Sequence, residues 1–286
     1  MDYSEFVKIL NKHIFEGEKK DLLKKIAENP ERFIGLFRPT KPQTKILQHI
    51  LQSHEIKMGD ALEEIIEKIL EEFGFKNLNK NIRNENGENL SLDQYFYKEE
   101  KYYFVEQKVR DDHDSSKKRG QISNFETKLD ILFKKHGANL IGIMYFIDPD
   151  LNKNKNYYLS EIERLKKFYG IDIYLFYGSE FFKFLGKEDF WSKMLEWLKK
   201  WKDNLPELPE INFDASPEES FEEIKDLDLR YWRKILENDK LWDYGIMKVL
   251  SKEGKTLRLV LEYFKNNPSH PYQQLVLRLS ERMRTF

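Results

Sequence analysis

Two carboxylates and a lysine fall on one expected β-hairpin, between residues 91 and 109. Both arms are rich in aromatic and β-branched residues, which favour strands, and the polar residues 98–101 between them supply a turn. If the turn holds two or four residues, Asp93 lies opposite Glu106 on the neighbouring strand. Because side chains alternate along a strand, Lys108 then shares a face with Glu106. An odd number of turn residues would remove this arrangement.

The charges of this triplet indicate its chemistry. Asp93 and Glu106 repel each other unless a cation lies between them, and hard carboxylate oxygens suit Mg²⁺. Lys108 could stabilise the charge that develops on a phosphate under attack, or help position or deprotonate the attacking water. The pattern predicts hydrolysis of a phosphodiester with Mg²⁺ as cofactor.

The tripeptide Glu-x-Lys is weak evidence by itself, because the composition produces other copies. They include residues 18–20, 223–225 and 253–255, in segments expected to be helices or turns. Only the copy at Glu106 closes an aromatic strand opposite an aspartate. The prediction of a site therefore depends on the hairpin and its register.

Glu63 is a fourth candidate ligand. Residues 59–73 predict an amphipathic helix whose buried stripe includes Leu62, Ile66 and Leu70. Glu63 lies on the shoulder of that stripe, where a carboxylate can face a site beside the sheet. An ordinary amphipathic helix is the alternative, and the hairpin is the reason to prefer a ligand.

Basic residues follow the hairpin, where a polyanion lying on the active face would pass. Lys117, Lys118 and Arg119 precede a helix expected from about residue 121 to residue 135, and Gln121 begins it. We predict that these four residues contact DNA. Aspartates at 111, 112 and 114 offset the positive charge, so a solvated charged loop is the alternative.

The order of predicted elements indicates an α/β protein in which a mixed central β-sheet is flanked by helices. Strands are expected at residues 77–82, in the hairpin, at 140–147 and at 171–177, with helices at 121–135, 158–169 and 179–202. We divide the chain into a helical N-terminal region (1–55), a nuclease core (56–204), an acidic linker (205–228) and a helical C-terminal unit (229–286).

The charge changes sharply near the end of the chain. Residues 203–228 hold ten acidic residues and one basic residue, 1 − 10 = −9, whereas residues 229–286 hold twelve basic and six acidic residues, 12 − 6 = +6. A basic helical unit after an acidic linker could read DNA or dimerise, and a plain packing subdomain is an equal alternative.

Composition excludes several classes of chemistry. The chain has no cysteine, so disulfides, thiolate metal sites and cysteine nucleophiles are absent, which fits a reducing cytosol. No run of eighteen apolar residues exists and the first ten residues lack the features of a signal peptide, so we expect a cytoplasmic protein without a membrane partner. The formal net charge is only −1, so any DNA-binding face must be local.

The sequence resembles the PD-(D/E)xK nuclease superfamily and, within it, the type II restriction endonucleases. The resemblance covers about residues 55 to 180: residues 59–63 on a helix, Asp93, then Glu106-Gln107-Lys108, followed by a helix and a strand. It implies a restriction-endonuclease-like core with helical N- and C-terminal regions, and a type II site-specific deoxyribonuclease that cleaves double-stranded DNA. A palindromic target implies a homodimer.

The resemblance also implies a role for each matching residue. Asp93 and Glu106 bind Mg²⁺, Lys108 assists the attacking water, and Glu63 supports a metal ion. One departure is Leu92, where the family pattern has proline, and it weakens the assignment of Asp93.

Two other functions are compatible with these residues. A DNA repair or junction-resolving nuclease of the same superfamily would use the same chemistry. A non-catalytic module that binds DNA or protein would carry the charged triplet as a surface ion-pair cluster, in which each pair contributes about 0–1 kcal/mol. Substituting such a cluster would leave fold and binding intact.

Overall fold

The computed structural model describes residues 1–35, 37–84 and 86–284. Residues 285 and 286, the end of the C-terminal unit expected from the sequence, lie outside the described residues. The chain divides into two compact units, of which the first comprises Met1–Leu10 and Met58–Leu205. The second comprises Asn11–Lys57 and Pro206–Phe286.

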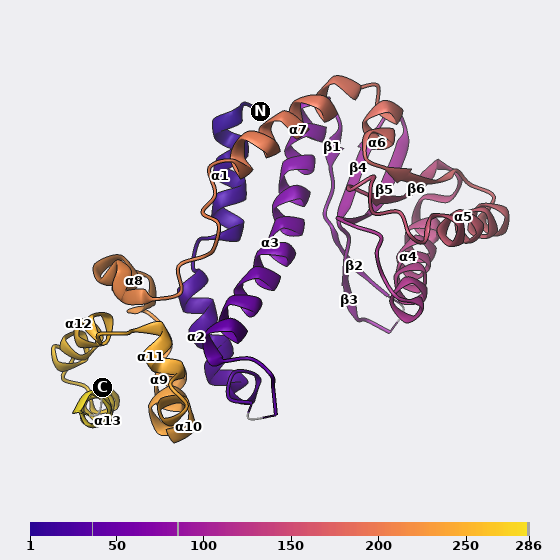
Figure 1. The fold of residues 1–286 in the computed structure, drawn as a ribbon. Coiled ribbons are helices and arrows are strands. Elements are labelled where there is room, and N and C mark those ends of the chain that lie inside the picture. Colours follow the sequence, from indigo (N-terminus) through magenta and orange to yellow (C-terminus); the bar gives the residue numbers. More distant parts are fainter. Residues whose placement is uncertain (36, 85, 285–286) are drawn as a thin grey trace. The chain divides into compact units, whose positions relative to one another are not determined.

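A mixed five-stranded sheet in the order β1-β4-β5-β6-β7 organises the first unit (Figure 1). The strands are β1 (Lys76–Asn77), β4 (Gln94–Lys98), β5 (Lys101–Lys108), β6 (Leu140–Phe146) and β7 (Ile173–Tyr177). The hairpin β4–β5 and the edge pair β1–β4 are antiparallel, whereas β5–β6 and β6–β7 are parallel. The expected fold class, α/β with a mixed sheet flanked by helices, is confirmed.

Helices cover both faces of this sheet. The helices that contribute to the first unit are α1 (Tyr3–Ile14), α3 (Pro42–Glu72), α4 (Ser115–His136), α5 (Lys155–Tyr169), α6 (Ser179–Phe184) and α7 (Glu188–Lys202). A short 3₁₀ helix, η2 (Gly137–Asn139), joins α4 to β6. Of the helices in the described ranges, none is long and apolar enough to cross a membrane.

Alternation along β5 and β6 decides which helix meets which side chain. Phe104 stacks on Phe125 of α4 at 5.3 Å between ring centroids, whereas Tyr145 stacks on Phe181 of α6 at 4.6 Å. Phe104, Glu106 and Lys108 are alternate residues of β5 and share one face of the strand, so the side chains of Glu106 and Lys108 face α4. Gln107 lies between Glu106 and Lys108 on the strand, so its side chain points to the opposite face of the sheet.

A glycine lets α4 lie close to the sheet. Gly142 on β6 is paired with Phe104, and a Cβ atom at Gly142 would lie 2.8 Å from Cδ1 of Leu129 on α4. A larger residue at this position would require the Leu129 side chain or the helix to shift. The close approach brings the neighbouring residue, Lys128, to the buried face of the sheet.

Three elements differ from those expected. Residues 77–82 were expected to form one strand, but the chain turns at Asn79, whose side chain accepts a hydrogen bond from the Asn81 backbone, and β2 (Asn81–Arg83) pairs instead with β3 (Asn89–Ser91). The expected helix 179–202 breaks at Gly186, which has φ +68°. Helix α4 begins at residue 115 because the Asp114 carboxylate accepts two backbone N–H groups of the first turn.

The second unit is built from helices. They are the end of α1, the first part of α3, and α2 (Glu18–Glu28), η1 (Pro30–Arg32), η3 (Phe213–Ala215), α8 (Pro217–Ile224), α9 (Leu229–Glu237), α10 (Asp239–Asp243), α11 (Ile246–Leu250), α12 (Lys255–Lys265) and α13 (His270–Arg284). Its core surrounds the fully buried Trp232 and includes Ile211, Phe213 and Ile224. The acidic segment 205–228 therefore carries apolar residues into this core.

Candidate active site

The turn of the β4–β5 hairpin holds two residues. Lys98 pairs with Lys101, so Glu99 and Glu100 alone form the loop, with φ of 51° and 62°. Two consecutive left-handed residues are typical of the tight turn that matches the twist of a hairpin. The even loop expected from the sequence is confirmed, and Tyr97 lies opposite Tyr102.

This register brings Asp93 next to the end of β5. The last paired residues are Gln94 and Val105, so one further step along both strands leads to Asp93 and Glu106. Asp93 Oδ2 accepts a hydrogen bond of 2.7 Å from the backbone N–H of Gln107. The Asp93 carboxylate is thus anchored beside the strand that carries the other two residues of the triplet.

Lys108 joins the two carboxylates. Its Nζ lies 2.8 Å from Asp93 Oδ2 and 2.9 Å from Glu106 Oε1. Burial disfavours the charged amine, but Glu106 and Asp93 outweigh this effect and raise the pKa of Lys108 above its usual value. Lys108 is therefore an ammonium group held between two carboxylates, with 30% of its side chain exposed.

The Glu106 carboxylate has further partners on α4 that sequence reasoning missed. Asn124 Nδ2 donates to Glu106 Oε1 at 3.0 Å, and Lys128 Nζ donates to Oε2 at 2.6 Å. Glu106 is 1% exposed and Lys128 is 5% exposed. The sequence held a signal, because Lys128 lies on the same helical stripe as Phe125 and Leu132, where a charge needs a partner.

Glu63 lies on α3 near Asp93. Burial and then the negative charge of Asp93 raise the pKa of Glu63 to about 7, against the smaller opposing effects of Lys80 and Lys108. Gln94 Nε2 donates to the backbone carbonyl of Glu63 at 2.8 Å, which joins the helix to the first residue of β4. The structure thus places the fourth predicted residue beside the triplet.

These residues have the chemistry of a divalent-cation site. Three carboxylates supply hard oxygen ligands, Asp93 and Glu106 already share one cationic group, and burial together with the negative charge of Asp93 raises the pKa of Glu63. Within the described ranges, no three acidic or histidine side chains stand close enough together to hold a metal ion as they are arranged here. The position between Asp93 and Glu106 is taken by the Lys108 ammonium in this arrangement.

The predicted DNA contacts lie at the start of α4, the helix that also carries Asn124 and Lys128. Lys117 and Arg119 are exposed, whereas Lys118 is partly covered and its Nζ lies 4.6 Å from the centre of the Tyr157 ring. Gln121 accepts a hydrogen bond from the Tyr158 hydroxyl. Their contact with DNA stays a prediction.

A second buried carboxylate fixes the loop that follows β5. Asp111 is fully buried and accepts hydrogen bonds from the Asn154 backbone and side-chain amides, both at 2.8 Å, and from the Tyr177 hydroxyl at 3.0 Å. These partners follow β6 and end β7, so Asp111 joins the ends of the three parallel strands. Its role is structural, because the amide and hydroxyl groups that donate these hydrogen bonds are neutral.

Comparison with known proteins identifies the family. The family model described as "Type II restriction endonuclease, HinfI" matches residues 3–87 and 75–202, more than half of the 286 residues. The matched segments include Glu63, Asp93, Glu106 and Lys108. Comparisons with curated proteins and with solved structures gave no match. The chain therefore belongs to the HinfI family of type II restriction endonucleases.

Proposed function

We propose that this protein cleaves double-stranded DNA at a specific sequence by Mg²⁺-dependent hydrolysis, as a type II restriction endonuclease. The observation that carries the proposal is the Lys108 ammonium lying 2.8 and 2.9 Å from the carboxylates of Asp93 and Glu106, at the end of a central strand. Family membership supports restriction over repair or junction resolution. The burial of Glu106 argues against a mere surface ion-pair cluster.

Asp93 and Glu106 are the residues that would hold Mg²⁺, with Glu63 as a supporting ligand. When bound, the ion would polarise the scissile phosphate and acidify a water molecule. In this arrangement the carboxylates of Glu106 and Asp93 raise the pKa of Lys108 against the opposing effect of burial. We assign Lys108 the task of stabilising negative charge on the phosphate oxygens or of positioning the attacking water.

Lys117, Lys118, Arg119 and Gln121 would contact the DNA next to this site. Phosphate contacts of this kind set register and orientation without reading bases. A palindromic target requires two active sites related by a twofold axis, so we propose a homodimer that acts in the cytoplasm. Molar mass measured by light scattering, with and without a duplex, tests the dimer: a monomer in both states would contradict it.

The cleavage proposal is tested with plasmid and genomic DNA in the presence of Mg²⁺. The parent is expected to give discrete fragments that EDTA abolishes. Asp93→Asn and Lys108→Met should each lower the cleavage rate by on the order of 10²–10³-fold or more, because each removes a charge from the reacting centre. A smear of random fragments would refute sequence specificity.

A matched control uses another copy of the same tripeptide. Lys255 follows Glu253 with the same spacing and pairs with it at 2.6 Å, but its side chain is 49% exposed. Lys255→Met should cut at the parental rate. If Lys108→Met also cuts at that rate, the site is assigned to the wrong residues.

A further inference from the structure

Helix α4 holds the two oxygens of Glu106 separately. Asn124 and Lys128 are four residues apart, so both side chains lie on one face of the helix, one turn from each other. Asn124 donates to Oε1 at 3.0 Å and Lys128 donates to Oε2 at 2.6 Å. With one donor from α4 on each oxygen, the helix restrains the plane of the carboxylate.

Lys128 does not reach the substrate. Only 5% of the residue is exposed, and its neighbours on the helix, Phe125, Leu129 and Leu132, are fully buried in the apolar core. A lysine so deeply buried requires a charged partner, and Glu106 lies within 2.6 Å. The ammonium of Lys128 therefore acts on Glu106 and on no DNA group.

The two lysines that contact Glu106 differ in how far their side chains are exposed. Lys108 contacts Oε1 from the open side, with 30% of its side chain exposed, whereas 7% of the Lys128 side chain is exposed. If Lys108 turns towards a phosphate or gives way to a cation, Glu106 loses one positive neighbour. Lys128 remains, so Glu106 stays compensated and Oε1 stays directed towards the site.

We propose that Lys128 is a positioning residue, which together with Asn124 holds Glu106 so that its Oε1 atom faces the incoming cation and Lys108. The proposal rests on the proposed function, because it assigns Glu106 to that site. Substituting a side chain that orients a metal ligand typically lowers metal affinity or activity by about 10- to 100-fold. A comparable loss is expected for Lys128→Met.

The experiment measures Mg²⁺ binding by calorimetry and the steady-state kinetics of DNA cleavage. For Lys128→Met we expect a Mg²⁺ affinity at least tenfold weaker and a lower kcat at saturating Mg²⁺, with the KM for DNA within threefold of the parent. Lys128→Arg, which keeps the charge, should recover part of both losses. Lys134→Met is the matched control, because Lys134 lies on the same helix in an exposed ion pair with Asp130, and it should match the parent.

A second pair of variants tests whether Lys128 acts through Glu106, even if Lys128→Met folds poorly. Glu106→Gln combined with Lys128→Met removes both charges, so it leaves no uncompensated ion. If Lys128 acts through Glu106, this double variant binds Mg²⁺ and cleaves DNA within threefold of Glu106→Gln alone. A further tenfold loss in either quantity would show that Lys128 acts independently and would overturn the proposal.

The experiment distinguishes failure of the nuclease proposal from failure of the positioning role. If the parent cuts no DNA, the nuclease proposal fails, yet the Mg²⁺ affinities of the Lys128 and Glu106 variants still report whether Lys128 acts through Glu106. If the parent cuts and Lys128→Met has the parental Mg²⁺ affinity and kcat, the positioning role is wrong while the nuclease proposal stands.

Discussion

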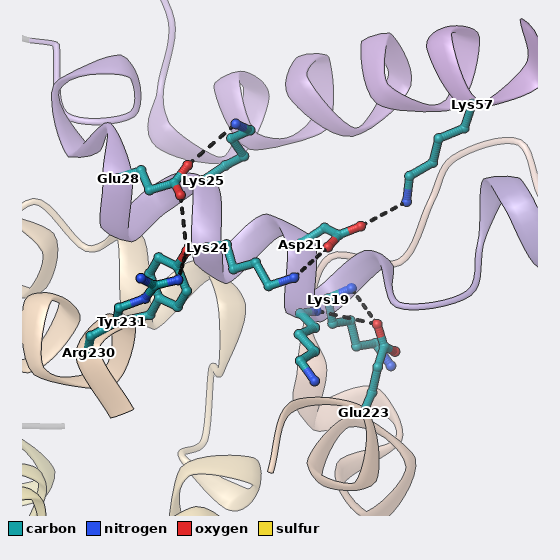
Figure 2. Close-up of polar contacts among 10 residues, drawn as sticks. Lys19, Asp21, Lys24, Lys25, Glu28, Lys57, Glu223, Arg230 and Tyr231 are labelled. Carbon is teal, nitrogen blue, oxygen red and sulfur yellow. Dashed lines mark hydrogen bonds and ion pairs between the residues drawn. The ribbon is translucent and has the colours of Figure 1, made fainter. Parts of the chain in front are cut away.

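Each unit of the molecule holds one carboxylate between two lysines. In the first unit, Glu106 contacts Lys108 through Oε1 at 2.9 Å and Lys128 through Oε2 at 2.6 Å. In the second unit, Asp21 contacts Lys24 through Oδ1 and Lys57 through Oδ2, both at 3.2 Å (Figure 2). The connectivity is the same, with one lysine on each oxygen.

The two arrangements differ in burial. Of the Asp21 side chain, 49% is exposed, whereas 1% of the Glu106 side chain is exposed. Water stabilises the charges around Asp21, so the ion pairs there contribute little. Around Glu106 each charge depends on its neighbours, because burying an unpaired ion costs several kcal/mol. The same pattern of contacts therefore stabilises the two units to different extents. The buried arrangement, around Glu106, belongs to the proposed catalytic site.

Lys128→Met should have the largest effect on stability. Removal of the lysine leaves Glu106 buried beside fewer positive charges, so we expect the free energy of unfolding to fall by about 3–5 kcal/mol. Glu106→Gln/Lys128→Met should recover most of this loss. Urea denaturation measures both values, and equal destabilisation of the single and double variants would contradict a coupled pair.

Asp111→Ala measures how much a buried carboxylate contributes to stability when only neutral groups hold it. Asp111 is buried like Glu106, but backbone, amide and hydroxyl groups hold it. We expect a loss of about 2–4 kcal/mol, because buried donors of Asn154 and Tyr177 lose their acceptor. The same urea series measures it. A change below about 1 kcal/mol would mean that these hydrogen bonds are readily replaced by water.

The raised pKa of Glu63 predicts a pH dependence of the protein's stability. Its pKa in the folded protein is about 7 and its ordinary value is 4.5, so the folded state binds more protons than the unfolded state between these values. The contribution of Glu63 to stability therefore falls as pH rises from about 4.5 to 7 and is constant above. Glu63→Gln does not titrate.

The melting temperature of Glu63→Gln relative to that of the parent should therefore increase across this pH range, by on the order of a few °C. Calorimetric scans in EDTA at pH 5, 6, 7 and 8 measure the difference. A difference that does not change with pH would contradict the raised pKa. Glu55→Gln, at an exposed position, is the control and should follow the parent.

Asp21→Asn should have the smallest effect. Water reaches the Asp21 carboxylate, whose side chain is 49% exposed, so we expect a change of about 0–1 kcal/mol in the free energy of unfolding, which added salt reduces further. Urea denaturation at low and high salt measures it. A loss comparable to that of Lys128→Met would show that the contrast in burial does not govern these energies.

Much of the candidate site was predictable because it is encoded locally. Strand alternation and a two-residue turn are short-range properties, and they were enough to predict that Glu106 and Lys108 share a face opposite Asp93. The apolar runs at residues 140–147 and 171–177 likewise indicated strands, which are β6 in the interior of the sheet and β7 at its edge. The split of residues 77–82 between two sheets was missed, because the Asn79 turn that causes it offers only a weak local signal.

Packing between distant segments decided the rest. Twenty-two residues separate Lys128 from Glu106, and their contact depends on how closely α4 approaches β6 over Gly142. The raised pKa of Glu63 likewise follows from burial and from Asp93, 30 residues further on. Residue types and strand periodicity therefore predict which groups can perform the chemistry. Burial, which a sequence does not state, determines which of those charges depend on one another.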